Sequence, residues 1–215
     1  MIVYGLYLQK GFQNQLPDIN KELPDLIKSA GLDPLEGIKG QPTGNIGFFY
    51  LNDLKGLDSA EMEDLKVTSA AFDENGIEGD LSFTLQVPKM EGVLVAEFAN
   101  GDPGFQGNVF LYRLQFTYTA SFKSPSEDGN YYILDLDISF ESSELPEIDV
   151  ELSGSNKQYE NQLENAIGQE LKDKDDSGIG KALIRSIDGY FTNYKVTLDT
   201  SVGPPPGDGP GPEQP

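Results

Sequence analysis

The spacing of apolar residues is helical at both ends of the chain and alternating in the middle. In residues 16–30 the apolar positions recur three or four apart, which predicts a helix. Pro17 suits its first turn, Pro24 predicts a kink or a restart of the helix, and Gly31 predicts a stop. The preceding residues 1–9 are apolar and rich in β-formers, so either a strand or a helix fits them.

Residues 46–152 alternate between apolar and polar side chains, which predicts strands with one apolar and one polar face. The clearest strand is 77–87, and a separate one is expected at 90–98. Turn signals at 73–76 and 100–104 predict an antiparallel meander of about six or seven strands. In the longest run, 105–122, alternation places one set of side chains on a single face: Phe110, Tyr112, Leu114, Phe116, Tyr118, Ala120 and Phe122.

Helical spacing returns near the C-terminus as two apolar stripes separated by a polar break. The first stripe comprises Tyr159, Leu163, Ala166, Ile167 and Leu171. The second comprises Ile179, Leu183, Ile184, Ile187, Tyr190, Phe191 and Tyr194. Burial of each large apolar side chain contributes roughly 1.5–3 kcal/mol, so the second stripe needs a broad apolar partner. The apolar sheet face is the available partner, which predicts an α+β fold: a long, highly curved antiparallel sheet wrapped around amphipathic helices.

Residues 1–200 are expected to form one domain, with a disordered tail at 201–215, where Pro and Gly dominate. The residues at the N-terminus lack the basic region and long apolar core of a signal peptide or a membrane span. No transmembrane segment is therefore expected. An extracellular or periplasmic location is our expectation, for a protein whose signal peptide is not part of this sequence.

The charge and the missing residue types narrow the chemistry. A net charge of −21, from 36 acidic and 15 basic residues, disfavours nucleic acids and anionic membrane surfaces as partners. The absence of Cys and His excludes Ser–His and Cys–His nucleophiles and the usual zinc sites. Acidic residues are abundant, but none stands out as a catalytic carboxylate pair. We expect a protein that is not an enzyme and that carries no cofactor.

Calcium is the one metal with a partial sequence match. The first half of an EF-hand loop fits Asp173, Asp175, Ser177 and Gly178. The bidentate Glu expected at the twelfth position is replaced by Ile184, so a charged break between two helices is the favoured interpretation. Asp135 and Asp137 share one side of a strand and are interpreted as a solvated face. No metal site is predicted.

Two short segments and the order of the elements resemble a known superfamily. An Asp33-Pro34-Leu35 turn follows the first helix, and the segment 51–58, LNDLKGLD, resembles the "L-x-N-L-x-x-GL-S" stretch of its members. Long alternating strands and paired amphipathic helices come after them. The chain resembles the tubular lipid-binding (TULIP) superfamily, especially the insect juvenile-hormone-binding and takeout proteins and the group-seven mite allergens. The N-terminal disulfide usual in the hormone-binding and takeout proteins is missing, because the chain has no Cys.

The resemblance implies a single roll that encloses an apolar pocket for a hydrophobic or lipid-like ligand. It places that pocket between the apolar sheet face and the C-terminal helix, with candidate lining residues Phe83, Leu85, Phe116, Tyr118, Leu136, Ile138, Leu183, Ile187 and Phe191. The same residues also suit a filled core. A structural or interaction protein, such as a matrix, surfactant or adhesion component, is therefore the alternative. A β-sandwich carbohydrate-binding module is disfavoured by the C-terminal helical segment.

Overall fold

A computed structural model describes residues 2–73, 76–128, 131–144, 146–172, 185 and 195–199. Its helical elements are α1 (Ile2–Ser29), the 3₁₀ turns η1 (Leu57–Ser59) and η2 (Gly154–Tyr159), and α2 (Glu160–Lys172). Its strands are β1 (Ile38–Gly40), β2 (Ile46–Lys55), β3 (Glu61–Asp73), β4 (Gly76–Phe98), β5 (Phe105–Asp128), β6 (Tyr131–Glu144), β7 (Glu147–Leu152) and β8 (Lys195–Asp199). The predicted α+β class, with a long antiparallel sheet and amphipathic helices, is confirmed.

The N-terminal helix is longer than the sequence pattern indicates. It begins at Ile2, includes the ambiguous residues 1–9 apart from Met1, and continues through both Pro17 and Pro24. Gly31, at φ 70°, follows its end as predicted, since glycine adopts this left-handed conformation without a steric penalty. The sequence left both a strand and a helix open for residues 1–9, and the helix forms because β-forming side chains are tolerated in a helix that gains tertiary contacts.

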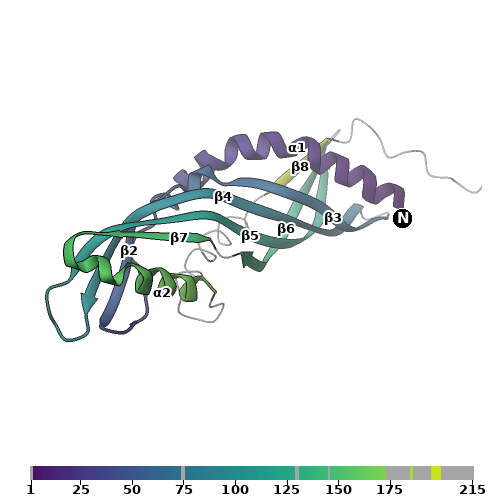
Figure 1. Ribbon diagram of the computed structural model, residues 1–215. Coiled ribbons are helices and arrows are strands. Elements are labelled where there is room, and N and C mark those ends of the chain that lie inside the picture. Colours follow the sequence, from purple (N-terminus) through teal and green to yellow (C-terminus); the bar gives the residue numbers. More distant parts are fainter. Residues whose placement is uncertain are drawn as a thin grey trace, which may run out of the picture.

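Two strands, β4 and β5, form the spine of the whole sheet. They are antiparallel partners over nearly their full length, and the predicted strands 77–87 and 90–98 are one continuous strand, β4. At one end of the spine the order is β3-β4-β5-β6-β8, and at the other it is β1-β2-β4-β5-β7. We call these the α1 half and the α2 half after the helix that packs on each. Figure 1 shows the long strands running the length of an elongated molecule.

The two halves meet where both spine strands lose their alternation. On β4, Val87 and Met90 are both buried although they are three residues apart, a spacing that would place them on opposite faces of a regular strand. On β5, Leu111 and Leu114 are buried at the same spacing. Arg113 lies between the latter two at φ 58°, outside the extended region. This double irregularity corrects the single face predicted for 105–122. Phe110 and Tyr112 lie half-buried on the outer face, whereas the buried members Leu114, Phe116, Tyr118, Ala120 and Phe122 lie on the inner one.

Each helix packs against strands from both edges of its own half. Helix α1 packs mainly on β3 and η1 and also contacts β8, and α2 packs on β7 and β1. The sheet therefore curls enough for one helix to reach both of its edges at each end (Figure 1). Figure 1 shows α1 above the long strands at one end and α2 below them at the other, a more specific arrangement than the predicted sheet wrapped around helices.

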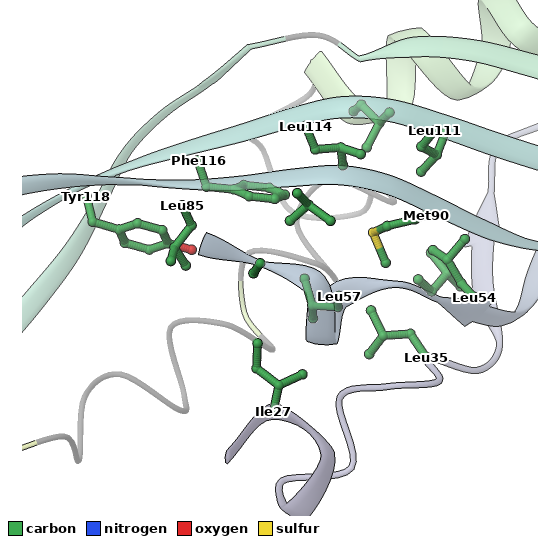
Figure 2. Packing of buried hydrophobic residues seen from close by; sticks show 14 of the residues in the cluster. Ile27, Leu35, Leu54, Leu57, Leu85, Met90, Leu111, Leu114, Phe116 and Tyr118 are labelled. Atoms are coloured by element: carbon green, nitrogen blue, oxygen red, sulfur yellow. The ribbon is translucent and has the colours of Figure 1, made fainter. Parts of the chain in front are cut away.

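One apolar cluster runs through both halves. From α1 it contains Leu8, Phe12, Ile19, Leu23 and Ile27, and from α2 it contains Leu163, Ile167 and Leu171. Figure 2 shows its continuity, with Ile27 of α1 beside Leu57 of η1, and with the inner-face side chains of β4 and β5 next to them. The stripe predicted for the first C-terminal helix is confirmed, and Ala166 and Tyr159 pack at its border.

Candidate functional site

Four of the candidate lining residues lie side by side on the inner face of the spine. Phe83 faces Tyr118 across the β4–β5 ladder, and their rings stack with centroids 5.3 Å apart and planes 14° apart. Leu85 faces Phe116 in the same way, one pair further along. All four side chains are at most 2% exposed, and Figure 2 shows Leu85, Phe116 and Tyr118 grouped together. The inner face is therefore apolar across two adjoining strands.

Two more candidates extend this face onto β6. Ile138 is paired with Ala120, and Leu136 is paired with Phe122, so both continue the surface started by Tyr118. Ile138 is buried, whereas Leu136 is half-buried. The remaining candidates, Leu183, Ile187 and Phe191, lie outside the described residues. Alternation within each strand identifies the six described positions, because they all lie on the α1 side of the irregularity at Arg113.

The two segments that carry the family resemblance fold against each other. The Asp33 carboxylate accepts hydrogen bonds from the backbone N–H groups of Gly56, at 2.7 Å, and Asp58, at 2.9 Å. Leu35 pairs with Leu54 through two backbone hydrogen bonds of 2.9 Å. The Asp-Pro-Leu turn therefore fixes the glycine–leucine stretch in place, and it positions η1 beneath the end of α1. The role of these segments is architectural, and the sequence alone does not reveal their contact.

A groove of about 540 Å³ crosses the far end of the α1 half, where polar side chains of four strands meet. Asp80 lies in this groove, and Ser69 and Ser121 each donate a hydrogen bond to it, at 2.6 and 2.7 Å. Both hydroxyls lower the pKa of Asp80 below its usual value, so this carboxylate remains ionised near neutral pH and is unsuited to donating a proton. Asp135 and Asp137, predicted as a solvated face, line the same groove together with Leu136.

Neither a metal-ligand cluster nor a membrane-spanning helix occurs among the described residues. No group of three or more acidic side chains there is arranged to hold a metal ion. The partial EF-hand segment Asp173–Gly178 lies outside the described residues. No described helix combines the length and the apolar character needed to cross a bilayer.

Comparison with known proteins yields distant structural neighbours. No protein-family profile matches the chain, and no curated protein matches it in a sequence search. Takeout 1 of Epiphyas postvittana is a solved structure with 14% identity and a TM-score of 0.41, covering 84% of this chain and 91% of its own. A lipopolysaccharide binding protein has 12% identity and a TM-score of 0.36, covering 82% of this chain and 37% of its own. Mmm1 has 9% identity and a TM-score of 0.24, covering 91% and 82%.

Because all three TM-scores are below 0.5, these neighbours assign neither a family nor a ligand to this chain.

Proposed function

We propose that this protein binds a small hydrophobic or lipid-like ligand inside the roll, without catalysis. The observation that carries the proposal is the apolar inner face shared by β4, β5 and β6, represented by Phe83, Phe116, Tyr118 and Ile138. An apolar chain buried against such a surface gains about 0.8 kcal/mol per methylene group. Sites of this kind need shape and few polar anchors.

The positions of the two described helices support the same proposal. Helix α1 packs chiefly along β3 and η1 and reaches the central strand β5 through Phe12, whose ring lies 5.5 Å from that of Phe122, while α2 packs along β7 and β1. The middle of the apolar face requires another apolar surface against it. We propose that the ligand lies between this middle region and the C-terminal apolar stripe that includes Leu183, Ile187 and Phe191. A location outside the cytoplasm stays a prediction from the sequence.

The first experiment asks whether the purified protein carries a ligand. Native mass spectrometry is expected to show a mass excess that organic extraction removes. The extracted protein should then take up a fluorescent fatty acid with saturable binding. A protein with neither a mass excess nor fatty-acid uptake would instead favour a filled core and a structural or interaction role.

A matched pair of substitutions on β5 then tests the place of binding. Phe116 and Phe110 share a strand and a residue type, but Phe116 lies on the inner face and Phe110 on the outer face. Phe116→Leu, which retains most of the apolar volume, should change the fatty-acid affinity. Phe110→Leu should leave it unchanged. Equal effects of the two substitutions would contradict an interior site.

A further inference from the structure

Helix α2 carries a central apolar stripe, and the polar side chains on its two flanks contact different parts of the fold. At 100° per residue, the buried Leu163, Ile167 and Leu171 form the central stripe. On one flank of this stripe Glu160 and Glu164 contact β7, and on the other Gln162 and Glu170 contact the turn after β1. The helix can therefore hold both edges of its half of the sheet at once.

The flank with Glu160 and Glu164 is attached to the neighbouring strand β7. Glu160 accepts a hydrogen bond from the backbone N–H of Leu152 at 2.9 Å, and Glu164 accepts one from Val150 at 3.2 Å. These partners are only 8 and 14 residues apart in the sequence. Tyr159, just before the helix, stacks on Phe105 with centroids 5.6 Å apart. Because the connection is short, these contacts re-form readily after any separation.

The opposite flank is attached to the turn that follows β1. Gln162 donates a hydrogen bond to the carbonyl of Thr43 at 2.6 Å, and Glu170 accepts one from the backbone N–H of Gln41 at 3.0 Å. These partners lie 119 and 129 residues apart, so no short connection holds them together. This flank is therefore the one that can separate while the other remains attached.

The buried carboxylate of Glu170 favours the separation of this flank from the turn after β1. It is the one buried charged side chain among the described residues, with 8% of its surface exposed. Its carboxylate has a single hydrogen-bond partner there, the N–H of Gln41. A buried carboxylate with few partners loses hydration that one hydrogen bond replaces only in part. Opening returns water to the carboxylate, which lowers the free energy of the open form relative to the closed one.

We propose that α2 is a strap that opens from β1 and remains hinged on β7, and that the contact between Glu170 and Gln41 is its latch. The opening exposes the apolar stripe of α2 and the inside of the α2 half. This inference concerns the motion of the fold alone, and it does not depend on the ligand proposed above.

Amide hydrogen exchange of the ligand-free protein, followed residue by residue by NMR, tests the strap. The N–H of Gln41 should have a smaller protection factor than those of Val150 and Leu152, because only Gln41 is released by the opening. Equal protection of all three, at the level set by global unfolding, would overturn the proposal.

Two matched substitutions test the latch in the same experiment. Glu170→Gln retains an oxygen that accepts the hydrogen bond but removes the buried charge, so the protection of Gln41 should rise several-fold. Glu164→Gln makes the same change on the hinge flank and should leave Gln41 unchanged. Glu170→Ala removes the acceptor and should lower the protection of Gln41. Lower protection in Glu170→Gln, or an equal rise in Glu164→Gln, would overturn the role of the buried charge.

Discussion

The two halves of the molecule use different side chains to cover the edges of one sheet. In the α1 half, neutral amides do so: Gln9 bonds to the backbone of Leu65 and Val67, and Asn20 bonds to both backbone groups of Met62. In the α2 half, three of the four fastening side chains are glutamates.

The arrangement differs as well. The amides of α1 reach one edge strand, β3, whereas the polar side chains of α2 reach both β7 and the turn after β1. An exposed strand edge invites pairing with another chain, and each helix prevents this in its own half. A helix that covers the edges of a curved sheet therefore needs polar side chains beside its apolar stripe.

The largest expected effects come from the apolar stripes, and they test whether the halves unfold together. Phe12→Ala in α1 and Ile167→Ala in α2 each remove a side chain that is at most 1% exposed. Each should lower the free energy of unfolding by about 2–5 kcal/mol. Because β4 and β5 belong to both halves, urea unfolding should remain a single transition by circular dichroism and by tyrosine fluorescence. Two separate transitions in either variant would show that the halves are independent.

The next largest effect is expected from the loss of the amide hydrogen bonds that attach α1 to β3. Asn20→Ala removes two hydrogen bonds, to the N–H of Met62 at 2.7 Å and to its carbonyl at 3.0 Å. The loss should be about 1–3 kcal/mol, since a half-buried strand edge is left without partners. Urea denaturation gives the value, and Lys21→Ala, at the exposed neighbouring position of the same helix, should change it little. A cost no larger than that of the control would mean that water replaces the amide at this edge.

Much of this architecture is predictable from the sequence, and the features that are not predictable share one cause. The alternation of 77–87 and the spacing of Leu163 and Ile167 reflect one face of one element, so local periodicity reveals them. The irregularity at Arg113 and the helical start at Ile2 do not, because neighbouring strands and tertiary packing decide them.

The candidate site divides in the same manner. The inner-face residues Phe83 and Tyr118 follow from alternation, whereas the fastening residues Asn20 and Glu170 do not. A polar residue beside an apolar stripe looks like any solvated position. Its partner is a backbone group 42 or 129 residues away, which carries no side-chain signal at all.

A smaller effect is expected from the loss of a glutamate hydrogen bond that attaches α2 to β7. Glu164→Ala removes one hydrogen bond of 3.2 Å from Val150 and should cost about 1 kcal/mol, less than Asn20→Ala, which removes two. Glu164→Gln should cost less still, because its amide oxygen can accept the same bond. Urea denaturation of the three variants under one condition gives the order. If Glu164→Ala were the most destabilising, the charge on α2 would matter more than the number of hydrogen bonds.

The smallest effect concerns a titratable contact that holds the end of α1 on η1. Lys28, in its last turn, forms an ion pair of 2.7 Å with Asp58 of η1. The hydrogen bond from Lys28 lowers the pKa of Asp58, and the same contact raises the pKa of Lys28. A lowered carboxyl pKa stabilises the fold above the unfolded value, about 3.9, and this contribution is lost as the pH falls through the folded pKa. A raised lysine pKa stabilises the fold below about 10.4, and that contribution is lost as the pH rises through the folded pKa.

The urea midpoints of the native protein and Asp58→Asn should therefore differ most near neutral pH, and the difference should shrink at both extremes. The amides of α1 do not titrate, so Asn20→Ala should show a difference that hardly varies over the same pH range. A pH-independent difference for Asp58→Asn would mean that the ion pair, exposed as it is, contributes nothing to holding α1 on η1.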